Sequence, residues 1–458
     1  MNVAGVKGLR RRDASTTVVA SLIGLILVCL ILTLASWRPT GGGRGVPVVA
    51  AVSAAVGLVA GGICWRLFWL IRRSTALFRE GIALVASGEV AAAEQRYRSA
   101  MAIGVRQVWS SSALNLGVLR HTAGDLPEAQ ALFESVIRHA KHHLTRRKAS
   151  WNLGTVHAAQ TDPRAAQSAY WWALETPDRD LQFLSILGLV DTLSPTEHQP
   201  EIAELLARAI SMQMAEEMPL AVIGLGRRAQ AAGHNVAAHS LLQQVVICGP
   251  GVPRATARVF RAHLFLTVDD QMAATEQCHL VPEAAWDQVP EATLLVAGYV
   301  LLRIGEQVRG LACWRRATSS ADVRIRVKAS SDMGEELLRL NNDVDAARPL
   351  LQLAVAQAAD HPDLLESAAV ATASLGYIAT VDGDLDRAHQ LWDQAITSGF
   401  PAAASMAQVY QARQSIIYGD IAEATELLQA ASAAGPPEVA SDAEHTLASL
   451  TGRPDLSR

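Results

Sequence analysis

The chain has 458 residues, half of them hydrophobic but only 5% aromatic, and its abundance of alanine and leucine favours helix. The net charge of −4 is unevenly spread: residues 1–80 carry ten basic and two acidic side chains, whereas the rest carries 42 acidic and 30 basic ones. An acidic body argues against a general nucleic-acid binder. Five scattered cysteines without a C-x-x-C pair argue against a disulfide framework and indicate a reducing compartment.

The N-terminal part begins with a basic segment, residues 1–15, followed by the uncharged run "TTVVASLIGLILVCLILTLASW" at 16–37. This run is long enough to cross a bilayer core of about 30 Å. A cleaved signal peptide is the alternative, but the run is longer than a typical signal core and no A-x-A site follows it. We therefore predict a first transmembrane helix at 16–37.

A second apolar run follows a short glycine-rich segment. Residues 38–45, "RPTGGGRG", predict a tight turn and not a phosphate loop, because no strand precedes them and no capped helix follows. We predict a second transmembrane helix at 46–71, whose end lies between Trp65 and Ile71. Trp37, Trp65 and Trp69 lie near the ends of the two runs, where indole rings prefer the membrane interface.

The flanking charges predict the orientation of this transmembrane hairpin. Four basic residues precede the first span and four follow the second, but only two lie between them. The positive-inside rule then places both ends in the cytoplasm and the turn outside. We expect a multi-pass protein of the cell (inner) membrane, in contact with its lipids, with the body of the chain in the cytoplasm. The three groups are Lys7, Arg10, Arg11 and Arg12; Arg38 and Arg44; and Arg66, Arg72, Arg73 and Arg79.

Residues 72–437 repeat with a period of about 36. The segments "GDLPEAQALFESV" at 124–136, "GDLDRAHQLWDQA" at 383–395 and "GDIAEATELLQAA" at 419–431 share one pattern. A Gly-Asp pair is followed by a small, a bulky and another small residue at helical spacing. The pattern predicts helical hairpins, with the Gly-Asp turn ending one helix and capping the next.

This pattern resembles the tetratricopeptide repeat (TPR) family. In each repeat of that family, position 8 is glycine, position 20 is alanine, position 24 is aromatic or bulky, and position 27 is alanine. The resemblance implies an α-solenoid of about ten helical hairpins. Together with the transmembrane hairpin that precedes it, this predicts an all-α chain. Units near 181–217 and 255–290 match weakly, and we interpret them as degenerate repeats. We expect a capping helix and tail at 438–458. The sets at the four positions are Gly81/Ala93/Tyr97/Ala100, Gly117/Ala129/Phe133/Val136, Gly154/Ala166/Tyr170/Ala173, Gly226/Ala238/Leu242/Val245, Gly298/Gly310/Trp314/Ala317, Gly334/Ala347/Leu351/Ala354, Gly376/Ala388/Trp392/Ala395 and Ala412/Ala424/Leu428/Ala431.

The resemblance implies a concave groove lined by the first helix of each hairpin. In the first three repeats its positions are mostly apolar and suit an amphipathic helix or extended apolar peptide. The alternative is that neighbouring repeats cover some of these side chains. Asparagines at 115 and 152 resemble part of the carboxylate clamp of chaperone-binding TPR domains, but its lysine and asparagine in an earlier repeat are absent. The candidate groove residues are Phe78, Ile82, Leu114, Asn115, Val118, Trp151 and Asn152.

The segment "RHAKHHLTRRK" at 138–148 is the densest basic cluster of the acidic body. His139 and His143, four residues apart on one predicted helix end, could face one metal ion, but no third ligand is near. A solvated helix end is the simplest interpretation. A third interpretation is a basic patch that binds anionic lipid or an acidic segment of a partner. The patch residues are Arg138, Lys141, Arg146, Arg147 and Lys148.

The window "DGDLDRAHQLWD" at 382–393 alternates aspartates as a calcium loop does. A calcium loop requires glycine at its sixth position, where this chain has Arg387. We therefore interpret Asp384 as a helix cap.

No catalytic motif is present, since the chain lacks a P-loop, a G-x-G-x-x-G fingerprint, an H-E-x-x-H pair and a G-x-S-x-G elbow. We expect no enzyme, no cofactor and no metal. The expected function is a membrane-anchored scaffold or adaptor that binds a protein or peptide partner, a component of a membrane complex, for the assembly of that complex. A regulatory or sensor protein is the alternative. The layout of two spans and then repeats resembles that of HemY-type membrane proteins, in architecture alone.

Overall fold

The computed structural model describes the backbone of residues 46–451 and the side chains of residues 55–450, and within this range every regular element is a helix. The expected all-α class is confirmed there. The predicted segments 1–15, 16–37 and 38–45 and the tail 452–458 lie outside the described residues. The chain forms two compact units, Met1–Leu205 (unit 1) and Leu206–Arg458 (unit 2), and each is described by itself.

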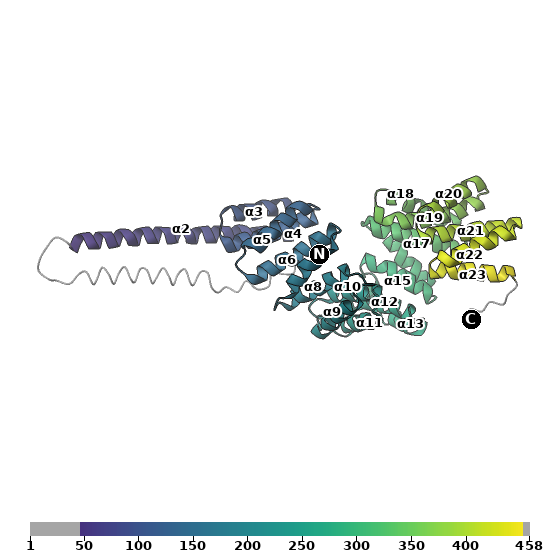
Figure 1. Cartoon of the computed structure of the whole chain (residues 1–458), viewed down its shortest axis with the longest axis horizontal. Helices are drawn as coiled ribbons and strands as arrows, with labels where there is room; N and C mark the ends of the chain where they lie inside the picture. The colour runs from purple at the N-terminus through teal and green to yellow at the C-terminus, as the bar shows by residue number, and fades with distance from the viewer. Residues whose placement is uncertain (1–45, 452–458) are drawn as a thin grey trace. The chain divides into compact units, whose positions relative to one another are not determined.

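Unit 1 consists of successive antiparallel helices that pack as hairpins (Figure 1). Its last helix, α9, crosses the boundary between the units. The helices are α2 (Val46–Ala86), α3 (Val90–Ala102), α4 (Arg106–Thr122), α5 (Leu126–His139), α6 (His143–Ala159), α7 (Pro163–Leu174), α8 (Arg179–Thr192) and α9 (Gln199–Met212).

Unit 2 continues with hairpins of the same kind and ends in one unpaired helix. Its elements are α10 (Pro219–Ala231), α11 (Asn235–Cys248), α12 (Gly251–Leu266), α13 (Gln271–His279), α14 (Glu283–Trp286), α15 (Glu291–Arg303), α16 (Gln307–Ala317), α17 (Val323–Asn341), α18 (Val344–Ala358), the 3₁₀ turn η1 (Pro362–Leu364), α19 (Leu365–Val381), α20 (Leu385–Thr397), α21 (Pro401–Tyr418), α22 (Ile421–Ala434) and α23 (Pro437–Thr451).

A glycine on the first helix and a bulky residue on the second determine how closely the two helices of a hairpin pack. A Cβ atom added to Gly117 would lie 2.5 Å from Cε1 of Phe133, and one added to Gly334 would lie 2.7 Å from Cγ of Leu351. The same contact occurs at each of the seven predicted glycine pairs. The predicted TPR-like register of these hairpins is therefore confirmed.

The Gly-Asp turns have the geometry that the sequence predicts. Gly124, Gly383 and Gly419 have φ between +81° and +83°, which is the left-handed conformation that glycine adopts without strain. The aspartate after each glycine caps the next helix. The carboxylate of Asp384, for example, accepts a hydrogen bond from the backbone N–H of Arg387 at 3.0 Å.

The first helices of successive hairpins contact one another, whereas the second helices contact chiefly their chain neighbours. The first helices therefore form an inner row and the second helices an outer row. In unit 2 the inner row curves back on itself, so that α15 lies near α23 (Figure 1). The hydroxyl of Tyr299 on α15 donates a hydrogen bond of 3.0 Å to Glu438 on α23. This curvature gives unit 2 a concave inner face.

Helix α2 joins the second predicted span to the first repeat without a break at residue 71. It has 41 residues, about 60 Å of helix. Its segment Ala55–Ala86 is long and apolar enough to cross a membrane and its apolar window is not buried, but length and composition alone do not establish a span. Pro362–Val381 passes the same test, yet it lies largely in α19 of the inner row and is partly buried there.

The hydrophobic core is a series of local clusters, each shared by two or three hairpins, as expected for a solenoid. At the C-terminal end, α23 packs against α21 and α22. Its Ala443 is fully buried with Leu428 and Ala412, so α23 covers the apolar face of the last hairpin.

Candidate functional site

The predicted groove of unit 1 lies on the inner row, on α2, α4 and α6. Ile82, Leu114 and Val118 are half-buried and pack partly against the cores of the first hairpins. Trp151 on α6 is also half-buried. These side chains are therefore partly exposed and also supported by the core.

Three of the predicted groove residues have internal partners. Phe78 is only 7% exposed and its ring packs 6.0 Å from the ring of Tyr97, so it is a core residue and not a surface for a partner. The amide of Asn115 donates to the hydroxyl of Tyr97 at 3.5 Å, and that of Asn152 donates to the carbonyl of Lys148 at 2.8 Å. These bonds give both asparagines a structural role.

The predicted basic patch is smaller than the sequence suggests. Arg147 is 6% exposed, lies over the ring of Trp172 at 4.2 Å and pairs with Glu175, so it does not belong to an exposed patch. Lys148 lies 3.8 Å from Asp178. Arg146, half-buried, also lies over the ring of Trp172. The exposed basic side chains are Arg138 and Lys141.

The interpretation of His139 and His143 as neighbours on one helix is wrong. His139 is the last residue of α5 and His143 the first of α6, and Ala140 between them is extended. His139 Nδ1 lies 2.9 Å from its own helix carbonyl at Ser135, and Nε of Arg147 donates to His143 Nε2 at 3.3 Å. Within the described residues, no three His, Cys, Asp or Glu side chains are arranged to hold a metal.

The aspartates of the 382–393 window serve the repeat itself. Asp382 accepts two hydrogen bonds from the guanidinium of Arg348, at 2.7 and 2.8 Å, and these bonds lower the pKa of its carboxyl. Asp384 is the cap described above. The interpretation of this window as a turn and cap is therefore confirmed.

The inner row of unit 2 carries a polar series that the sequence analysis missed. Arg227, His263, Tyr299 and Glu335 follow one another at intervals of 36 residues, on α10, α12, α15 and α17. They occupy the repeat position that Val118 has in unit 1. The 36-residue period, extended into the second half of the chain, would have identified them.

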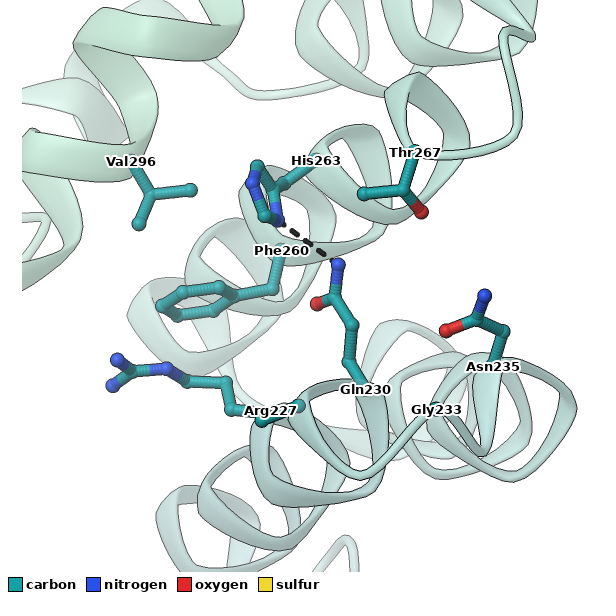
Figure 2. Close-up of a pocket in the computed structure, with 9 residues that line it drawn as sticks. Arg227, Gln230, Gly233, Asn235, Phe260, His263, Thr267 and Val296 are labelled. Carbon is teal, nitrogen blue, oxygen red and sulfur yellow. Dashed lines mark hydrogen bonds between the residues drawn. The ribbon is translucent and has the colours of Figure 1, made fainter. Parts of the chain in front are cut away.

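A cavity of about 490 Å³ opens beside the first two members of this series, between α10, α11, α12 and α15. Figure 2 shows the Gln230 side chain directed at His263, with the Arg227 side chain running beside the ring of Phe260. Asn235 and Thr267 line the cavity on one side and Val296 on another.

The cavity is positively charged. The guanidinium of Arg227 lies 4.7 Å from the centre of the Phe260 ring, and burial and the charge of Arg228 lower its pKa. Burial and the charge of Arg227 lower the pKa of His263, and this shift favours the neutral imidazole. Neutral His263 accepts a hydrogen bond at Nδ1 from the amide of Gln230, 3.0 Å away.

The next part of the inner face is acidic. Burial and the neighbouring Asp332 raise the pKa of Glu335 to about 8, although the hydroxyl of Ser331 donates to its carboxylate. Burial raises the pKa of Asp332 to about 6. Opposite them, the rings of Tyr377 and Tyr410 stack with their centres 5.1 Å apart. The inner face of unit 2 therefore changes from basic to acidic along its length.

Comparison with known proteins gives no family. No family model matches the sequence, and no curated protein matches it. Solved structures do match. A tetratricopeptide repeat protein from Parabacteroides merdae is 16% identical over 62% of this chain and 99% of its own, with a TM-score of 0.39.

Two further matches cover more of this chain. Human IFIT1, solved as a dimer with PPP-AAAA, is 12% identical over 74% of this chain and 81% of its own, with a TM-score of 0.45. Yeast Tom70 is 12% identical over 83% of this chain and 96% of its own, with a TM-score of 0.30. Identities and scores this low carry no functional argument, so the assignment of the fold rests on the packing of this chain itself.

Proposed function

We propose that the chain is a membrane-anchored TPR scaffold or adaptor, which binds a protein or peptide partner on its inner faces at the cytoplasmic side of the membrane. One observation carries this proposal: an exposed apolar helix continues without a break into the first hairpin of a repeat array. Leu58, Ile63 and Trp65 are each at least 56% exposed. A helix this apolar and this exposed requires a bilayer or another apolar cover.

The inner face of unit 1 supports the binding role. Leu114, Val118 and Trp151 present half-buried apolar surface on neighbouring helices of the inner row. Apolar side chains at helical spacing fit an amphipathic helix laid into a groove. Tethering at the membrane would raise the effective concentration of such a partner near the membrane.

The test is crosslinking and recovery of partners from native membranes, with the full-length chain and a Leu114→Glu/Val118→Glu variant. We expect a partner to be recovered with the native chain and lost with the variant, because two carboxylates would be placed in an apolar contact. The matched control is Val236→Glu, which adds a carboxylate at an 83% exposed position at the start of outer helix α11.

Circular dichroism of the variants separates loss of binding from loss of folding, and Leu114→Gln provides a milder change at the same position. If a folded double variant retains the partner, the groove of unit 1 is not the binding face. The exposed Arg138 and Lys141 then become the next surface to change.

A further inference from the structure

The cavity beside Arg227 has an excess of positive charge and hydrogen-bond donors. Arg227 contributes a guanidinium, and its pKa is influenced by another cation but by no carboxylate. Gln230, Asn235 and Thr267 add amide and hydroxyl groups, and none of the residues lining the cavity is acidic. A site with this composition favours an anion.

The guanidinium is accessible although it is partly desolvated. Much of the Arg227 side chain is exposed, whereas its plane rests against Phe260, which is 4% exposed. The contact with the ring holds the guanidinium in place, so less side-chain entropy is lost when it binds a ligand. Phe260 and the half-buried Val296 also provide an apolar surface beside the charge.

The neighbouring inner face carries carboxylates, Asp332 and also Glu438, which pairs with Arg303 at 3.6 Å, so it favours a ligand with a single acidic group over a chain of phosphates. The ring of Tyr299 lies 5.7 Å from that of His263, and its hydroxyl donates to Glu438. Asp332 lies on the next inner helix. A nucleic-acid strand along this face would bring further phosphates against these carboxylates, whereas a peptide with one acidic side chain would not.

We propose that the Arg227 cavity binds an aspartate or glutamate side chain of the peptide partner, followed or preceded by an apolar residue that covers Phe260 and Val296. The inference rests on the proposed function, because it names the chemistry of a peptide bound on the inner face. Arg227 would form a paired hydrogen bond with the carboxylate. The amide of Gln230, oriented by His263, would supply a further donor.

The test uses the full-length chain in lipid nanodiscs and a displayed library of random 12-residue peptides, depleted first on empty nanodiscs. We expect peptides with an Asp or Glu next to an apolar residue to be enriched. Changing that acid to Gln or Asn in the best peptide should weaken binding about tenfold, measured by fluorescence polarisation.

Two variants test the role of Arg227. Arg227→Leu keeps the aliphatic stem on Phe260 and should bind the acidic peptide and its amide analogue within about twofold of each other. Arg227→Glu should reverse the preference and bind a Lys analogue most tightly. Arg387→Glu makes the same charge change at an exposed position on outer helix α20 and should leave the preference unchanged.

The remaining outcomes separate this inference from the proposed function. If peptides are enriched without a common acid, or the preference survives in a folded Arg227→Leu variant, the inference is wrong and peptide binding stands. If no peptide is enriched, both fail. If a 20-residue poly(U) probe binds more tightly than any peptide and Arg227→Glu abolishes its binding, the site holds a nucleic-acid phosphate and the inference is overturned.

Discussion

In most hairpins, one glycine on the first helix determines how closely the second helix packs. Gly154 leaves room for the ring of Tyr170, and a Cβ added there would lie 2.6 Å from Cε1 of that ring. Gly188, on the first helix of the next hairpin, lies against the other edge of the same ring, where an added Cβ would be 2.6 Å from Cζ. Tyr170 is therefore held between two glycines, and the second contact joins neighbouring hairpins.

The first prediction concerns this kind of contact. Gly117→Ala should lower the free energy of unfolding by up to about 2 kcal/mol, because the overlap of the new Cβ with the buried ring of Phe133 costs about 1–3 kcal/mol and alanine in the helix returns roughly 1 kcal/mol. Chemical denaturation followed by circular dichroism measures the change. Gly251→Ala is the control, because open space surrounds that position, and it should not destabilise the chain. Equal stability of the two variants would contradict the packing argument.

The second prediction concerns Glu335. Because the pKa of Glu335 is raised in the folded chain, its carboxyl loses its proton at a lower pH in the unfolded chain than in the folded chain. The free energy of unfolding therefore falls as the pH rises from about 4.5 towards 8. Glu335→Gln removes this loss and should raise stability by at least about 1 kcal/mol at pH 8 and have little effect at pH 4.5. Thermal unfolding at a series of pH values measures this. The variant keeps the acidic groups that interact with Glu335, which are Asp332 and Glu336 on its own helix, Glu438 on α23 and Tyr410 on α21.

Sequence reasoning predicted the packing pairs better than the binding residues. Pairs such as Gly117 and Phe133 follow from repeat position alone, because every hairpin must satisfy the same contact. The burial of Phe78 and Arg147 does not follow from repeat position. Each is covered by a residue on the second helix of its hairpin: Tyr97 covers Phe78, and Trp172 covers Arg147. A repeat position indicates the direction of a side chain and not what covers it.

At the scale of elements, α2 has two environments along one helix. Its segment from Ala55 to Ile71 is largely exposed, whereas Ser74, Phe78 and Gly81 are buried in the first hairpin. The apolar run alone predicted a span ending near residue 71. The continuity of the helix was not predictable from it, because the basic residues after the run are equally compatible with a break.

The third prediction follows from these two environments. A chain without residues 1–71 should be monodisperse without lipid or detergent and should unfold with a free energy within about 1 kcal/mol of the full chain, since the removed part of α2 contributes little to the core. Sedimentation velocity and thermal unfolding measure both properties. A chain without residues 1–45 keeps the apolar helix and should require lipid. Monodisperse behaviour of this longer chain in plain buffer would contradict the prediction.

At the scale of the whole molecule, the stability of each hairpin depends mainly on the hairpins next to it. Within each unit, the hydrophobic clusters are shared by two or three neighbouring hairpins. In such arrays each repeat depends mainly on its neighbours. The period of about 36 residues predicted this architecture, including the helices α8 and α9 and the hairpin α12–α13, where the residues match the pattern weakly. The curvature that brings Tyr299 to Glu438 depends on small rotations between repeats, which no motif records.

The fourth prediction concerns this locality. Gly117→Ala should increase amide hydrogen exchange in the hairpins of unit 1 and leave residues beyond about 250 unchanged, and Gly334→Ala should do the reverse. Hydrogen–deuterium exchange with mass spectrometry compares the two variants peptide by peptide. Increased exchange throughout the chain in either variant would show that the array unfolds as one cooperative body.

Because α2 is unbroken, the number of residues before Gly81 determines the direction in which the first hairpin faces. Each residue turns an α-helix by 100° and advances it by 1.5 Å. With the apolar segment held in a bilayer, removing one residue between Arg66 and Arg73 would point the first hairpin a little over a quarter-turn away from its native heading. Removing four residues would leave the hairpin within about 40° of its native direction and would bring it about 6 Å closer to the membrane. With the apolar segment of α2 in a bilayer, the length of this helix would therefore determine the direction in which the first hairpin faces.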